Sequence, residues 1–67
     1  MAYTLTKSEL LSLLHARGPQ RIGPMVGYVQ SIAREDGSGR SFNVHVIPVD
    51  RKPGDSKTTA IHVRTVD

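Results

Sequence analysis

The chain has 67 residues, of which 37% are hydrophobic and none is cysteine, and its net charge is +3 at pH 7. This length predicts a single small domain over residues 1–67 and leaves little room for a ligand pocket of a few hundred Å³, so we expect neither an enzyme nor a small-molecule site. The lack of cysteine excludes disulfides. We also expect no membrane span and no signal peptide, and therefore a cytoplasmic location.

The first predicted element is a helix over about residues 7–17. Thr6 and Glu9 have the spacing of a capping box. Gly18 and Pro19 are typical of a helix end. Leucines at helical spacing form an apolar stripe that the rest of the domain must cover. The stripe consists of Leu10, Leu13 and Leu14, with Leu11 beside it.

The middle of the chain contains a predicted loop and an ambiguous segment. Two glycines and two prolines in residues 18–24 predict the loop. Residues 25–35 fit a helix, because several apolar residues share helical spacing. They also fit a strand, because Gly27 disfavours a helix interior and the apolar residues are mostly β-prone. A Gly-rich stretch at 36–39 resembles a hairpin loop, so we favour the strand. The apolar residues are Met25, Tyr28, Val29 and Ile32.

The clearest pattern lies in residues 42–65, where apolar and polar residues alternate on both sides of Pro53-Gly54. This pattern predicts a two-stranded antiparallel hairpin closed around that dipeptide. A looser loop is the alternative, because Pro-Gly is not a preferred two-residue hairpin turn. A register symmetric about the turn places the apolar residues on one face and polar residues on the other. The expected pairs are Val46–Ile61 and Val44–Val63 on the inner face, and His45–His62 and Asn43–Arg64 on the outer face.

Together these elements predict an α+β fold, in which an N-terminal helix packs on a three-stranded antiparallel β-meander (order α-β-β-β). The last strand would be an open edge of the sheet. The leucine stripe would cover the inner sheet face, which bears Phe42, Val44, Val46, Ile61 and Val63.

No residue pattern suggests catalysis, a metal or a cofactor. The serines lack a histidine–carboxylate partner that spacing would dictate. His45 and His62 lack the further ligands that a metal site requires. The segment 36–39 is not followed by the lysine and helix of a phosphate loop. We therefore expect no catalytic residue, no metal and no cofactor.

The outer sheet face is the best candidate surface. Arg and Asn side chains can contact base edges, and Arg and Lys contact phosphates. The pI of about 9.8 suits a polyanionic partner. We therefore expect a small basic binding module that contacts DNA or RNA, with its sheet in the major groove of a duplex. The candidates are Arg34, Arg40, Asn43, His45, His62 and Arg64 on the sheet or at its turn, and Arg17, Arg21, Arg51 and Lys52 in loops.

Two other interpretations stay open. Ile47, Val49 and Ala60 fall on the same outer face and favour a protein-interaction module that docks through them and the edge strand. Such a module would be a homodimer, or an inhibitor or accessory protein of phage or mobile-element type. The polar side chains also fit a solvated face that only keeps the domain soluble. Tyr28 is the only exposed aromatic candidate on the sheet, which falls short of the aromatic platform of single-strand binders.

Overall fold

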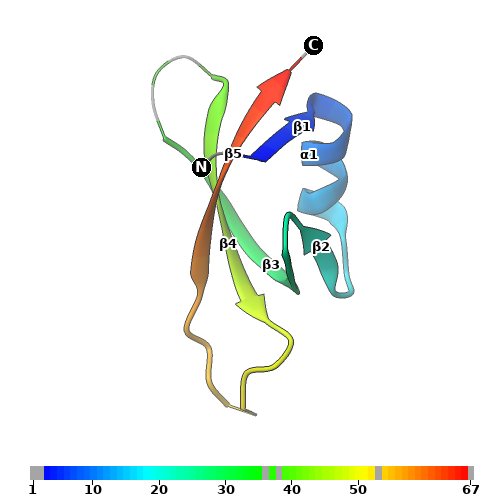
Figure 1. Cartoon of the computed structure of the whole chain (residues 1–67), viewed down its shortest axis with the longest axis vertical. Helices are drawn as coiled ribbons and strands as arrows, with labels where there is room; N and C mark the ends of the chain where they lie inside the picture. Colours follow the sequence, from blue (N-terminus) through cyan, green and yellow to red (C-terminus); the bar gives the residue numbers. More distant parts are fainter. Residues whose placement is uncertain (1–2, 36, 38, 53, 67) are drawn as a thin grey trace.

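A computed structural model of the chain describes residues 3–35, 37, 39–52 and 54–66 (Figure 1). Five strands form one sheet in the order β1-β5-β4-β3-β2, which curls into a half-barrel. β1 runs parallel to β5, and the other neighbours are antiparallel. The elements are β1 (Tyr3–Thr6), α1 (Lys7–His15), β2 (Gln20–Ile22), β3 (Met25–Arg34), β4 (Ser41–Pro48) and β5 (Thr59–Val66).

The predicted α+β fold with a three-stranded antiparallel meander is wrong. The domain is mostly β, with one short helix and a mixed five-stranded sheet. The prediction omits β1, which leads directly into the helix, and β2, which lies in the predicted loop 18–24. These two short strands are the edges of the sheet. β1 pairs with β5 along Val63–Val66, so this part of β5 is not an open edge. No helix in the described part of the chain is long and apolar enough to cross a membrane.

Helix α1 begins with the predicted capping box. The backbone N–H of Glu9 donates to Oγ1 of Thr6 at 3.1 Å, and the N–H of Thr6 donates to Oε1 of Glu9 at 3.0 Å. The helix ends at His15, earlier than predicted, and its C-cap is Ala16 in an extended conformation. Leu14 is 53% exposed, so the part of the stripe that is buried is narrower than predicted.

Thr6→Ala should lower the free energy of unfolding by about 1 kcal/mol, because the first helical turn loses its side-chain acceptor. Urea unfolding followed by circular dichroism measures this loss. Ser8→Ala is the matched control, since Ser8 is an exposed hydroxyl residue in the same turn that accepts no capping bond. Equal stabilities of the two variants would contradict a contribution from the cap.

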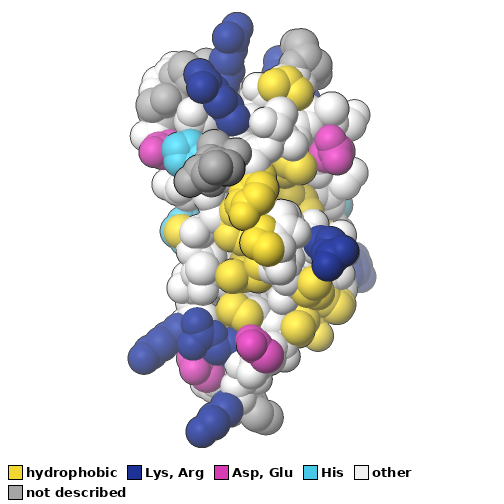
Figure 2. Space-filling model, viewed as in Figure 1, with side chains coloured by type: hydrophobic (Ala, Val, Ile, Leu, Met, Phe, Trp, Pro, Cys, Tyr) yellow, Lys and Arg dark blue, Asp and Glu magenta, His cyan; other side chains and the backbone are white. Residues whose placement is uncertain are grey.

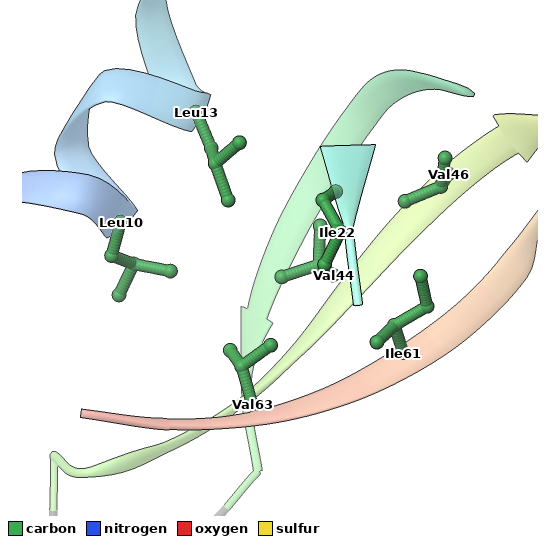
Figure 3. Packing of buried hydrophobic residues seen from close by; sticks show 7 residues of the cluster. All are labelled: Leu10, Leu13, Ile22, Val44, Val46, Ile61 and Val63. Carbon is green, nitrogen blue, oxygen red and sulfur yellow. The ribbon is translucent and has the colours of Figure 1, made fainter. Parts of the chain in front are cut away.

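The hydrophobic core lies inside the curl of the sheet, and α1 closes one end of it (Figure 3). The predicted core residues of β4 and β5 are confirmed as buried, except that Phe42 is only partly buried. The prediction lacks Ile22, which enters the core from β2 and is 2% exposed. The cluster consists of Leu10, Leu13, Ile22, Val44, Val46, Ile61 and Val63.

Strand β3 confirms the favoured interpretation of residues 25–35 and contains an irregularity. Its register against β4 shifts between Val29 and Ser31, so Gln30 has no partner residue in β4. Val29 pairs with Val46, and Ile32 pairs with Val44. Residues three apart in β3 therefore lie opposite two core valines, because the bulge restores the inward orientation after one extra residue.

Strands β4 and β5 are antiparallel as predicted, but they end well before the predicted turn. Residues 49–58 connect them, so the strands do not close tightly around Pro53-Gly54, and Pro53 itself lies outside the described residues. The register also differs from the prediction by two residues, since Val44 pairs with Ile61. A shift by an even number of residues leaves each side chain on its predicted face. The residues predicted to face the core therefore still face it, although their partners differ.

Candidate functional site

The outer face of the sheet is the surface opposite the core, and most candidate residues belong to its strands. Paired residues of neighbouring strands project from the same face, so the register defines rows across the sheet. From the loop 49–58 toward the β3–β4 turn, the rows are Arg21–Val26–Val49, Tyr28–Ile47, Ser31–His45–Ala60, Ala33–Asn43–His62 and Ser41–Arg64–Thr4.

The rows nearer the β3–β4 turn form a polar half of the outer face. It consists of Asn43, His45, His62 and Arg64, together with Glu35 at the end of β3. Asn43 lies opposite His62, and His45 lies opposite an alanine. The predicted pairs His45–His62 and Asn43–Arg64 are therefore wrong. The four predicted residues nevertheless share one face of two adjacent strands.

Glu35 is a member of the polar half that the sequence interpretation lacks. Its Oε2 lies 2.9 Å from Nδ1 of His62, and the two side chains are 38% and 40% exposed. The contact involves the edge of the imidazole ring. The spacing from Ala33 to Glu35 is the only sequence signal for this position, because it places Glu35 on the same face.

The rows nearer the loop 49–58 form an apolar half. It consists of Val26, Tyr28, Ile47 and Val49. Val26, Tyr28 and Val49 are 38%, 47% and 49% exposed, whereas Ile47 is partly buried. Ile47 and Val49 were expected on this face, and Tyr28 was expected to be exposed on the sheet, but Val26 was not expected beside them. Ala60 lies next to His45, between the halves. The outer face is thus divided along the strands and is not a mixture.

An open hollow of about 850 Å³ adjoins the apolar half, between the β2–β3 turn and the loop 49–58. Val26 and Val49 contribute to its wall, and so do Arg51 and Asp55. Nη1 of Arg51 lies 3.6 Å from Oδ2 of Asp55, which offsets part of the positive charge of the loop. The hollow therefore extends the apolar half and ends in a loop whose charge is mixed.

Most basic side chains that Figure 2 shows lie toward the two ends of the long axis, and one lies near mid-height at the right edge. Arg34 pairs with the core-facing residue Phe42, so it does not lie on the outer face. Arg40 lies at the rim, where its carbonyl accepts a bond of 2.8 Å from the N–H of Thr65. Arg17 follows α1, and Arg51 and Lys52 belong to the loop 49–58. The structure thus places five of the ten predicted residues on the outer face. They are Arg21, Asn43, His45, His62 and Arg64.

The edges of the sheet offer little for a partner strand. β1 has four residues and β2 has three. The ring of Tyr3 in β1 covers Gly23 in the β2–β3 turn, where a Cβ atom would lie 2.7 Å from the ring. The prediction of an open β5 edge is therefore wrong along Val63–Val66, where β1 pairs with the strand.

Metal binding has no support in the described residues. No three of His, Asp and Glu come close enough together there to hold an ion.

In comparisons with known proteins, no family model matches the chain, and neither a curated protein nor a solved structure is significantly similar to it.

Proposed function

We propose that this chain is a small basic binding module that contacts nucleic acid through the polar half of its outer face. The observation that carries the proposal is the grouping of Arg64, Asn43 and His62 on the adjacent strands β4 and β5. Arg and Asn can make paired hydrogen bonds to base edges, and Arg also binds phosphate. Glu35 is the acidic residue of this half, and its carboxylate is paired with His62.

We propose a cytoplasmic location, because a chain without cysteine needs no oxidising compartment.

Binding should depend strongly on salt, because each neutralised phosphate releases condensed counterions. Fluorescence anisotropy with a labelled oligonucleotide at two salt concentrations measures this dependence. Tighter binding at low salt is expected. The absence of binding at low salt, or binding that salt does not change, would contradict the proposal.

Arg64→Gln should weaken binding and reduce the salt slope by about 1, because one phosphate contact is lost. Lys7→Gln is the matched control, since it removes the same charge from the first turn of α1, away from the outer face. Equal effects of the two variants would show that only net charge matters. The polar half would then have no special role.

A protein-interaction module is the second candidate, and the exposed side chains of Val26, Tyr28 and Val49 favour it. Exposed apolar groups that adjoin one another often mark contact sites. This surface would serve a homodimer, or a module that inhibits or assists a larger protein. Sedimentation velocity over a range of concentrations tests the first form, because a strict monomer excludes self-association through this patch.

A further inference from the structure

We infer that the nucleic acid bound by this face is single-stranded, and that its bases stack on the side-chain rings of Tyr28, His45 and His62. This inference rests on the proposed function and narrows it to one class of partner. Stacking on aromatic side chains is the usual way in which proteins hold unpaired bases, and histidine serves as well as tyrosine.

The three rings occupy successive rows and successive strands of the outer face. Tyr28 is in β3, His45 is in β4 one row further along, and His62 is in β5 one row beyond that. Tyr28 is 47% exposed, and the side chain of His62 is 40% exposed. Glu35 contacts the His62 ring at its edge, through Nδ1. The sheet thus has a diagonal line of three rings. One is the phenol ring of Tyr28, and the other two are the imidazole rings of His45 and His62.

The spacing of this line fits splayed bases. Diagonal neighbours on a sheet are about 7–8 Å apart. Consecutive bases in one strand of a duplex are only 3.4 Å apart. Bases on successive rings must therefore be separated from one another. A single strand can adopt that arrangement, whereas a paired duplex cannot.

The width of the sheet argues against a duplex. The major groove is about 12 Å wide and admits a helix or a two-stranded ribbon. Strands β4 and β5 are not a free ribbon, because β3 flanks β4 and β1 flanks β5 along Val63–Val66. The polar half cannot enter a major groove as a β-ribbon would.

Two cations on the same face complete the arrangement. Arg21 lies in the row beyond Tyr28, and Arg64 lies in the row beyond His62. They flank the line of rings at its two ends. A backbone that crosses the three rings would therefore meet a guanidinium group at each end, which matches the charge of its phosphates.

The test measures how tightly the full chain binds a labelled mixed-sequence oligonucleotide at low salt. The oligonucleotide is supplied as single-stranded DNA, as single-stranded RNA and as the DNA duplex. We expect a single strand to bind at least tenfold more tightly than the duplex. The two single-stranded probes show whether the 2′-hydroxyl contributes. Equal or tighter binding of the duplex would overturn this inference and leave the proposed function intact. Failure of all three probes to bind would overturn both.

Tyr28→Val keeps a β-prone side chain and removes the ring. It should weaken single-strand binding roughly 5- to 150-fold, the range found when stacking on one base is lost. Tyr28→Phe keeps the ring and should bind more tightly than Tyr28→Val. Leu14→Ala is the control, because it shortens an exposed side chain of α1 outside the outer face. Equal binding by the wild-type chain and Tyr28→Val would overturn the inference.

A spectroscopic measurement keeps the test decisive if Tyr28→Val does not fold. The chain has two tyrosines and no tryptophan, so its intrinsic fluorescence comes from Tyr3 and Tyr28. Stacking of a base on Tyr28 should quench part of this fluorescence. The near-isosteric Tyr28→Phe should lose the part of the quenching that comes from Tyr28, since Tyr3 is then the only tyrosine and its ring covers Gly23. Quenching that persists unchanged in Tyr28→Phe would overturn the assignment of Tyr28.

Discussion

Gly27→Ala should lower the free energy of unfolding by about 3 kcal/mol or more, at the upper end of the range for overpacked cores. A domain of this size has a total stability of roughly 3–10 kcal/mol. The melting temperature should therefore fall by on the order of 10–25 °C. This is one of the two largest effects that we expect from a single substitution.

The physical reason is the close approach of β3 and β4 at this glycine. A Cβ atom at Gly27 would overlap the side chain of Val46 and lie 2.5 Å from the carbonyl oxygen of Ile47. Val46 is completely buried, so its side chain has no free volume into which it can move. The backbone carbonyl can move only if the ladder between the strands opens. Both responses cost stability.

Thermal unfolding followed by circular dichroism measures the effect. Gly18→Ala is the matched control, because a Cβ atom there has no neighbour within 4 Å and the backbone does not have a positive φ. That control should be as stable as the wild-type chain, or slightly more stable, since alanine restricts the unfolded chain. A melting temperature of Gly27→Ala equal to that of Gly18→Ala would contradict the close approach.

Residues 25–35 show why the sequence alone leaves helix and strand open. The apolar residues Val29 and Ile32 are three apart, which is a helical spacing. In the structure Val29 lies opposite Val46 and Ile32 lies opposite Val44, because the register shifts by one residue between them. A bulge changes the alternation of a strand in a way that resembles the period of a helix. Only the partner strand reveals the difference, and a single sequence does not identify it.

The hairpin shows which part of a register can be predicted. Alternation fixes the face of each residue, and the faces of β4 and β5 are as predicted. Alternation does not fix which residues pair, because any even shift preserves the faces. The pairing depends on where the strands end, and the ten residues 49–58 contain no pattern that marks those ends. The pair His45–His62 is wrong for this reason.

The outer face was only partly predictable. The polar side chains of β4 and β5 follow from alternation. The division into halves depends on β3, because Val26 and Tyr28 extend the apolar half and Glu35 joins the polar half. Their positions depend on the register of β3 against β4, including the bulge. The sequence therefore predicts an outer sheet face, but it does not predict which part of that face is polar and which part is apolar.

Ile22→Ala should lower the free energy of unfolding by about 2–5 kcal/mol, because it leaves a cavity in a core that can relax only partly. Ile22 is the only apolar residue among 18–24, where glycines and prolines dominate the sequence signal. Its side chain is nevertheless 2% exposed, and its strand β2 pairs with the start of β3. A three-residue strand thus supplies one of the most buried side chains. Urea unfolding followed by circular dichroism measures the loss.

Leu14→Ala is the matched control, and the two variants together distinguish the observed fold from the predicted meander. In the meander, Leu14 belongs to the covered stripe and Ile22 to a surface loop, so Leu14→Ala would be the costly change. In the half-barrel, Leu14 is 53% exposed, and alanine is a good helix former, so its replacement should change stability by no more than about 0.5 kcal/mol. Ile22→Ala should be several kcal/mol less stable than Leu14→Ala. The reverse order would contradict the half-barrel, in which Ile22 is in the core and Leu14 is exposed.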